Sequence, residues 1–153
     1  MMRFSLLLSL CILCSFKSNR VTIDLVYIRN HYEQAITNKE ICTTMIDVLK
    51  KSKRNNIELA YLGGLQTIWA NHTINPLAKL KTFDTGKANI EQAVSNEKDN
   101  VEIRFVRLSV QKNCPKFLGY SKSITEDESY IKQHLTEVQP ESLKKMIANV
   151  LNN

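Results

Sequence analysis

The stretch that decides the fold is residues 81–108, which read KTFDTGKANIEQAVSNEKDNVEIRFVRL. Its first part places apolar residues at helical intervals, at Phe83, Ile90, Ala93 and Val94, with the small residue Gly86 among them. This spacing puts the apolar side chains on one side of a helix. Because a small residue lets a neighbouring helix approach closely, we expect this helix to pack against another.

A polar turn follows at residues 96–100, with the sequence NEKDN. Asn and Asp favour turns and helix N-caps because their side-chain oxygens accept hydrogen bonds from free backbone N–H groups. Either Asp99 or Asn100 can cap the next helix, and Glu102 adds negative charge to its first turn. We therefore expect a second helix to begin at this turn.

The second helix carries apolar residues on two sides, which indicates that it lies between neighbours. Its main polar stripe consists of Arg104, Arg107 and Gln111, which are the candidate binding residues. Two other interpretations of the stripe are open, a solvent-facing side and a set of internal ion pairs. Residues 101–105 also alternate in polarity, as a strand does. A helix is preferred because the apolar positions continue beyond this segment.

The rest of the chain also favours helices, since only four Gly and three Pro interrupt 153 residues. Periodicity and capping signals predict helices over 20–37, 39–51 and 57–72, from Pro76, from Ser123 or Thr125, and from Pro140. We predict an all-α fold of six to seven helices packed as antiparallel hairpins, in one domain spanning residues 19–153.

Three details of these helices can be tested against a structure. In the helix over 20–37, Tyr27, His31 and Ala35 are expected to share one face. In the helix from Pro76, the expected apolar face is Leu77, Leu80 and Phe83. At the start of the helix near Ser123, either Thr125 with Glu128 or Ser123 with Glu126 has the spacing of a capping box.

Residues 1–18 have the pattern of a cleaved secretory signal peptide. Arg3 supplies the positive start, and an apolar run from Leu6 to Cys14 follows. Lipid anchoring through Cys11 or Cys14 is the alternative, although the bulky residues before them do not fit a lipobox. We expect an exported protein, periplasmic or secreted, without a transmembrane helix in its mature chain.

Part of the chain resembles a tetratricopeptide repeat. Gly86, Ile90 and Ala93, followed by Lys98-Asp99-Asn100, are similar to the second helix and exit turn of that repeat, and Leu62-Gly63 to the Leu-Gly pair of its first helix. Lys98 stands where the repeat has proline, and the spacing from Gly63 to Gly86 is longer than in a standard repeat. The resemblance implies a degenerate, right-handed stack of helical hairpins.

The mature chain also resembles a family of small exported proteins of unknown function from Bacteroidota. The resemblance rests on residues 70–72, 75–76, 79–83, 99–105 and 117–120 and on Glu126-Asp127. It implies an all-helical, repeat-like fold and no assigned activity, so it transfers no catalytic residue.

The chain lacks the common sequence motifs of catalysis and metal binding. His31, His72 and His134 stand alone, without the spacing of paired metal ligands. Cys42 and Cys114 can form a disulfide or remain buried thiols, and neither belongs to a Cys-x-x-Cys pair. We predict no cofactor and no metal.

Charge and motifs together favour a binding function. The net charge is +6, and basic and acidic residues are mixed along the helices, which argues against nucleic acid as a partner. The leading hypothesis is a non-enzymatic helical module that binds or scaffolds a protein or peptide of the cell envelope. The alternative is a small periplasmic enzyme, or a small-molecule-binding protein, with a site under residues 115–121.

Overall fold

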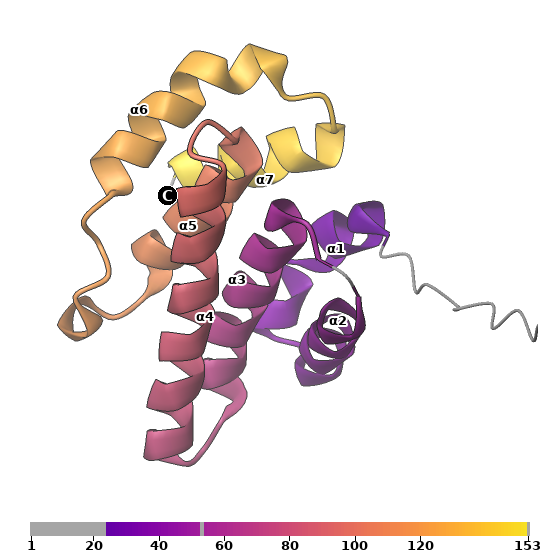
Figure 1. Cartoon of the computed structure of the whole chain (residues 1–153), viewed down its shortest axis with the longest axis vertical. Coiled ribbons are helices and arrows are strands. Elements are labelled where there is room, and N and C mark those ends of the chain that lie inside the picture. Colours follow the sequence, from indigo (N-terminus) through magenta and orange to yellow (C-terminus); the bar gives the residue numbers. More distant parts are fainter. Residues whose placement is uncertain (1–23, 53, 153) are drawn as a thin grey trace, which may run out of the picture.

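The computed structural model describes residues 24–52 and 54–152, and this part of the chain is all-α (Figure 1). It contains α1 (Leu25–His31), α2 (Lys39–Lys51), α3 (Asn56–His72), α4 (Pro76–Asn96), α5 (Val101–Asn113), α6 (Ile124–His134) and α7 (Glu141–Asn152). Three 3-10 turns lie between them, η1 (Gln34–Ile36), η2 (Lys116–Leu118) and η3 (Leu135–Glu137). The predicted all-α class is confirmed, whereas the predicted signal peptide lies outside the described residues.

The segment that decides the fold forms two helices joined by a short turn, as expected. α4 continues without a break through Gly86, and the side chain of Asn75 caps its start. Asn100 caps α5, because its Oδ1 accepts hydrogen bonds from the backbone N–H groups of Glu102 at 3.1 Å and Ile103 at 3.2 Å. Residues 101–105 are helical, so the strand interpretation is wrong.

The antiparallel pair α3 and α4 forms the central hairpin of the molecule (Figure 1). The backbones of the two helices touch at Gly63 and Gly86. Gly64, on the same turn of α3, leaves room for the ring of Tyr32, which also packs edge-on against Tyr61. The expectation that small residues allow close helix approach is therefore confirmed.

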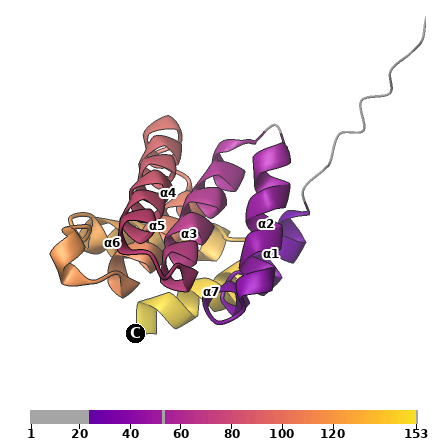
Figure 2. The same cartoon turned by 90° about the horizontal axis from the view of Figure 1, so that it is seen from below.

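α5 is the most deeply buried helix, since every residue from Glu102 to Gln111 is buried. It contacts α3, α4, α6 and α7, as expected for a helix with apolar residues on two sides. Figure 2 shows α1 and α2 on one side of α3, and α4 to α6 on the other. The outer end of the α3–α4 hairpin projects away from α6 and α7 (Figure 1).

The prediction for the first helix is wrong in length and in face. α1 ends at His31, and the chain turns before η1 instead of continuing as a helix to residue 37. Tyr27 and His31 stack on each other at 4.0 Å on the outside, and Ile28, Tyr32 and Ala35 enter the core. The turn at Tyr32 places its ring over Gly64, a tertiary contact that helical periodicity does not reveal.

Neither expected capping box forms at the start of α6. Ser123 occupies the N-cap position, but its side chain makes no capping hydrogen bond. The two glutamates that would complete the boxes bind cations on α5 instead, Glu126 to Arg104 and Glu128 to Lys112. Tertiary ion pairs thus replace the local cap.

Candidate functional site

The predicted polar stripe of α5 lies in the interior of the molecule. Arg104, Arg107 and Gln111 have exposed fractions of 7%, 6% and 4%. The structure therefore matches the second interpretation of the two arginines, internal ion pairs. A role of these residues in binding a partner stays a prediction that no observation tests.

Both arginines of the stripe bind Asp127 of α6, whose side chain is completely buried. Arg107 forms a two-pronged contact with it, from Nε to Oδ2 at 2.7 Å and from Nη2 to Oδ1 at 2.7 Å. Arg104 adds a third bond from Nη1 to Oδ1 at 2.9 Å. Burial alone would lower the pKa of Arg107, but the hydrogen bonds and charge of Asp127 raise it well above its usual value. Asp127 thus holds α6 against α5.

Arg104 also connects the α4–α5 turn with α6. Its Nε donates to the carbonyl oxygen of Lys98, and its Nη1 donates to Glu126 Oε1 at 2.8 Å. Its guanidinium carbon lies 4.3 Å from the ring centroid of Tyr130, a cation–π contact. The hydrogen bond from Arg104 lowers the pKa of Glu126 below its usual value. Arg104 therefore connects the start of α6 with the start of α5.

Tyr120 is the buried residue of the segment 115–121, under which the alternative hypothesis places a ligand site. Its hydroxyl donates to Glu91 Oε1 at 2.6 Å, and its ring meets Phe83 edge-on at 6.2 Å. Burial and then the hydrogen bond to Glu91 raise its pKa. Phe117, in the same segment, is exposed. The alternative function stays a hypothesis.

A second buried polar cluster connects α1, α3 and α5. Arg29 donates to both carboxylate oxygens of Glu102, at 2.7 and 2.8 Å, and the hydroxyl of Tyr61 donates to Glu102 Oε1 at 2.8 Å. Burial and the neighbouring Glu102 raise the pKa of Tyr61. From the sequence, Glu102 is expected to add negative charge to the first turn of its helix. In the structure it is also the centre of a three-helix contact.

The two cysteines of the described residues are free thiols, so the disulfide alternative is not seen. Cys42 is buried on α2, and its Sγ donates to the carbonyl oxygen of Leu65 at 3.5 Å. Burial raises the pKa of Cys42 to about 12. Because the thiolate is the reactive form, this residue is poorly suited to nucleophilic chemistry.

The three histidines bind backbone carbonyls, with ring-nitrogen to oxygen distances of 2.8 Å. His31 pairs with Tyr27, His72 with Ala35 and His134 with Tyr130. Within residues 24–52 and 54–152, no group of three His, Cys, Asp or Glu side chains could hold a metal ion. In the same part of the chain, no helix is long and apolar enough to cross a membrane.

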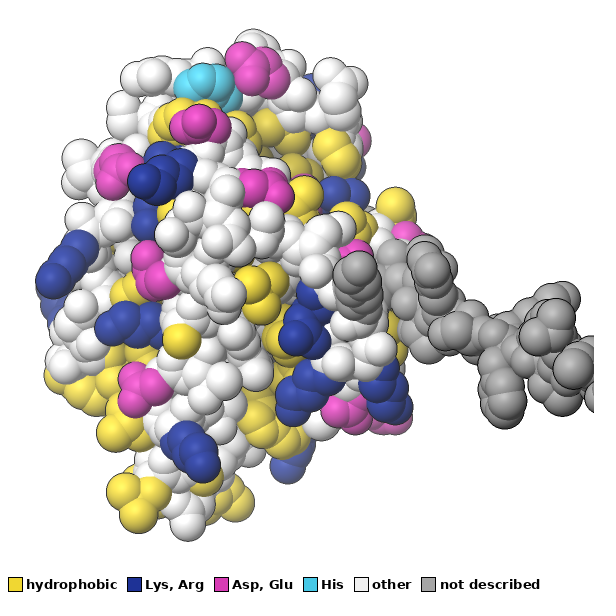
Figure 3. All heavy atoms as spheres, viewed as in Figure 1, with side chains coloured by type: hydrophobic (Ala, Val, Ile, Leu, Met, Phe, Trp, Pro, Cys, Tyr) yellow, Lys and Arg dark blue, Asp and Glu magenta, His cyan; other side chains and the backbone are white. Residues whose placement is uncertain are grey.

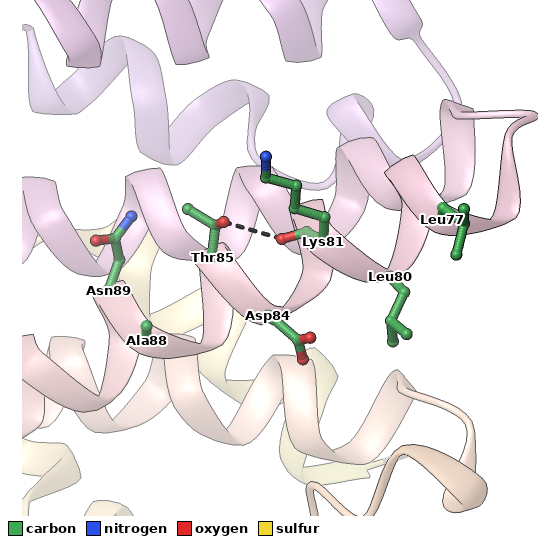
Figure 4. Close-up of a pocket in the computed structure, with 7 residues that line it drawn as sticks. All are labelled: Leu77, Leu80, Lys81, Asp84, Thr85, Ala88 and Asn89. Carbon is green, nitrogen blue, oxygen red and sulfur yellow. Dashed lines mark hydrogen bonds between the residues drawn. The ribbon is translucent and has the colours of Figure 1, made fainter.

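A shallow groove of about 590 Å³ follows the outer side of α4 (Figure 4). We call it the α4 groove, and its lining residues are Leu77, Leu80, Lys81, Asp84, Thr85, Ala88 and Asn89. Figure 4 shows the two leucines near the start of the helix and Ala88 and Asn89 further along it.

The α4 groove corrects the predicted apolar face of this helix. Of the three residues expected on that face, only Phe83 enters the core, whereas Leu77 and Leu80 are exposed. The exposure of Leu77 could have been identified from the helical wheel alone, because the core positions Phe83, Gly86 and Ile90 lie on a different side of α4.

No protein-family model, no curated protein and no solved structure matches this chain. The resemblance to an exported family of Bacteroidota therefore stays a prediction.

Proposed function

We propose that the chain is an exported, non-enzymatic module that binds a helical segment of another protein along the α4 groove. The observation that carries this proposal is the outward side of α4, where the exposed apolar residues Leu77, Leu80 and Ala88 lie among the groove residues. Leu77, Leu80 and Ala88 are separated by three and eight residues, and all are exposed. A helix in a groove is a recurrent mode of peptide recognition.

The shape of the α4 groove suits a helix as the bound element. All its lining residues come from one helix, so a second helix can lie along it by ordinary helix–helix packing. Ala88 keeps the far end of the groove low, and Lys81 and Asp84 offer one charge of each sign at its edges. The expected ligand is an amphipathic helix with two or three large apolar side chains that meet the two leucines.

The interior charges support a structural role for the remaining polar groups. Asp127 is neutralised by two arginines and Glu102 by Arg29. Because these buried charges are already paired with one another, they offer no free group to a substrate. Binding at the outer surface is therefore a better supported function than catalysis in the interior.

A degenerate tetratricopeptide-like arrangement also belongs to this proposal. It is supported by the contact of Gly63 on α3 with Gly86 and Ile90 on α4. These three are among the residues on which the resemblance rests. In helical-repeat proteins, hairpins present extended surfaces to peptides and proteins. We also propose that the hairpins form a right-handed stack and that the partner belongs to the cell envelope.

The proposal is tested by site-specific photocrosslinking in the cells that produce the protein. A photoreactive phenylalanine analogue replaces Ala88 in the groove and, as the control, Lys145 on the exposed surface of α7. We expect one defined protein to crosslink through position 88 and not through 145. The purified partner should then bind the wild-type chain, and Ala88→Glu should weaken binding by at least about tenfold, since it places a charge in an apolar contact.

Two results would contradict the proposal. One is a partner that crosslinks equally through both positions. The other is a purified partner whose affinity is unchanged by Ala88→Glu while circular dichroism shows an intact fold.

Export is tested separately by mass spectrometry of the mature N-terminus, which we expect to begin near residue 19. An intact Met1 would refute cleavage.

A further inference from the structure

Four large apolar side chains face solvent at one end of the molecule. Ile74 precedes α4, Leu77 and Leu80 lie in its first two turns, and Phe117 lies in η2. Their exposed fractions are 98%, 80%, 48% and 86%. We call Ile74 and Phe117, which lie outside the α4 groove, the apolar tip. Figure 3 shows hydrophobic side chains gathered along the edge of the molecule where the α3–α4 hairpin ends and where η2 lies.

Positive charge accompanies the apolar tip. Lys79 and Lys81 lie on the first turns of α4 and Lys116 on η2, and all three are exposed. Asp84 is the only acidic residue within residues 73–85 and 115–119, so the three lysines outnumber it. None of these lysines forms a salt bridge within residues 24–52 and 54–152. The charge of the tip is thus available to an anionic partner.

We propose that the apolar tip inserts into the surface of a membrane that contains anionic lipids. Apolar side chains flanked by lysines match the two layers of such a surface, the acyl boundary and the negative headgroups. The lysine stems can lie along the apolar region while their ammonium groups reach the headgroups. Such binding does not require any of the helices described in residues 24–52 and 54–152 to span the bilayer.

The shape of the tip favours a lipid surface over a protein partner. Ile74 is almost fully exposed in the loop between α3 and α4, and that loop is the outer end of the projecting hairpin (Figure 1). Neither Ile74 nor Phe117 lines the α4 groove. A protein partner packs best against a recess, whereas protruding side chains can enter the soft boundary of a bilayer without a complementary pocket.

The first experiment locates the tip relative to the bilayer with a single tryptophan. In the full chain, Trp69→Phe removes the only native tryptophan, and Phe117→Trp or Lys145→Trp supplies a new one. Vesicles contain phosphatidylglycerol with brominated acyl chains, which quench tryptophan on contact. We expect strong quenching at position 117 and little at position 145. Both proteins carry the same N-terminal residues, so the difference reports the orientation of the folded part.

The second experiment tests the charge of the tip. The triple substitution Lys79→Glu, Lys81→Glu and Lys116→Glu should lower the partition into anionic vesicles by at least about a hundredfold, because each lysine near an anionic surface contributes substantially to the free energy of binding. The matched control is Lys50→Glu with Lys51→Glu and Lys145→Glu, which changes the net charge equally at exposed positions elsewhere. We expect the control to lower the partition far less.

The apolar contribution is tested by Ile74→Asp with Phe117→Asp, which should lower the partition by at least about tenfold. Both side chains are exposed, so the fold should survive, and circular dichroism checks this. Ala88→Glu should leave lipid binding unchanged, so failure of the groove proposal and failure of the membrane proposal are distinguishable.

Three outcomes would overturn the membrane proposal. One is equal quenching at positions 117 and 145, and another is an equal loss of partition in the two triple-lysine variants. The third is that the tip does not bind vesicles and is instead covered by a second copy of the chain or by a protein partner. In the Phe117→Trp variant, that outcome would be seen as a change in the tryptophan emission spectrum when protein is added in the absence of vesicles.

Discussion

Gly63 and Gly86 hold the backbones of α3 and α4 in direct contact, since a Cβ atom on either glycine would lie 2.5 Å from the carbonyl oxygen of the other. The contact is reciprocal, and the atoms that a side chain would meet belong to the backbone, which cannot move aside as a flexible side chain can. The close contact between α3 and α4 therefore depends on two residues that lack side chains.

Gly86→Ala is expected to destabilise the protein by about 1–3 kcal/mol, the usual range for overpacking. This loss exceeds the gain in helix propensity of about 1 kcal/mol, because the new methyl group would also lie 2.8 Å from Thr67 Cγ2. Urea unfolding followed by circular dichroism measures the change. Ser95→Ala, at an exposed position of the same helix, is the control and should change little. A higher unfolding midpoint for Gly86→Ala would contradict the close contact.

Asp127→Asn is expected to cost about 3–5 kcal/mol, the range for breaking a buried ion pair by changing one partner. The substitution keeps the shape of the side chain but removes the negative charge that Arg104 and Arg107 share. The free energy of unfolding from a urea titration gives the magnitude. A cost below about 1 kcal/mol, the level of an exposed pair, would show that Asp127 does not hold α6 in place.

Glu126→Gln is expected to cost only about 0.2–1 kcal/mol at neutral pH, because the Glu126 side chain is 64% exposed and its bond to Arg104 is screened by water. The pKa of Glu126 is lowered in the folded state from 4.5. Its stabilising effect is therefore present above about pH 4.5 and is lost as the pH falls through the lower folded pKa. The stabilities of wild type and Glu126→Gln, measured across acidic pH, should converge. A gap that stays constant to low pH would argue against the ion pair.

Alkaline pH is expected to unfold the protein through its buried tyrosines. Burial raises the pKa of Tyr32, Tyr61 and Tyr120 above the usual value of 10.0. Since the unfolded chain then loses these protons first, stability is full below about pH 10 and falls as the pH rises above it. Tyrosinate absorbance from these residues should appear together with the loss of helical circular dichroism. Ionisation of all three in a still folded protein would refute their burial.

The sequence predicts the helices best where local interactions decide their ends. Asn38, Asn75 and Asn100 each cap a helix through their own side-chain oxygen, and such contacts form between residues two or three positions apart. The first helix is predicted less well because its end depends on Tyr32 reaching Gly64 on another helix. The candidate binding residues are chosen for their polarity, which does not indicate on which side of α5 the other helices lie.

By itself, the sequence determined the all-α class, the α4–α5 hairpin and the need for small residues where helices approach, since helix periodicity, capping and side-chain size are local properties. Only the tertiary structure decided which polar and apolar side chains are buried. Arg104 and Arg107 enter the core because Asp127, about twenty residues further along the chain, supplies the opposite charge there. Leu77 and Leu80 stay outside because the outer side of α4 has no neighbouring helix in the described part of the chain. Burial depends on what packs against a helix, and that neighbour is distant in sequence.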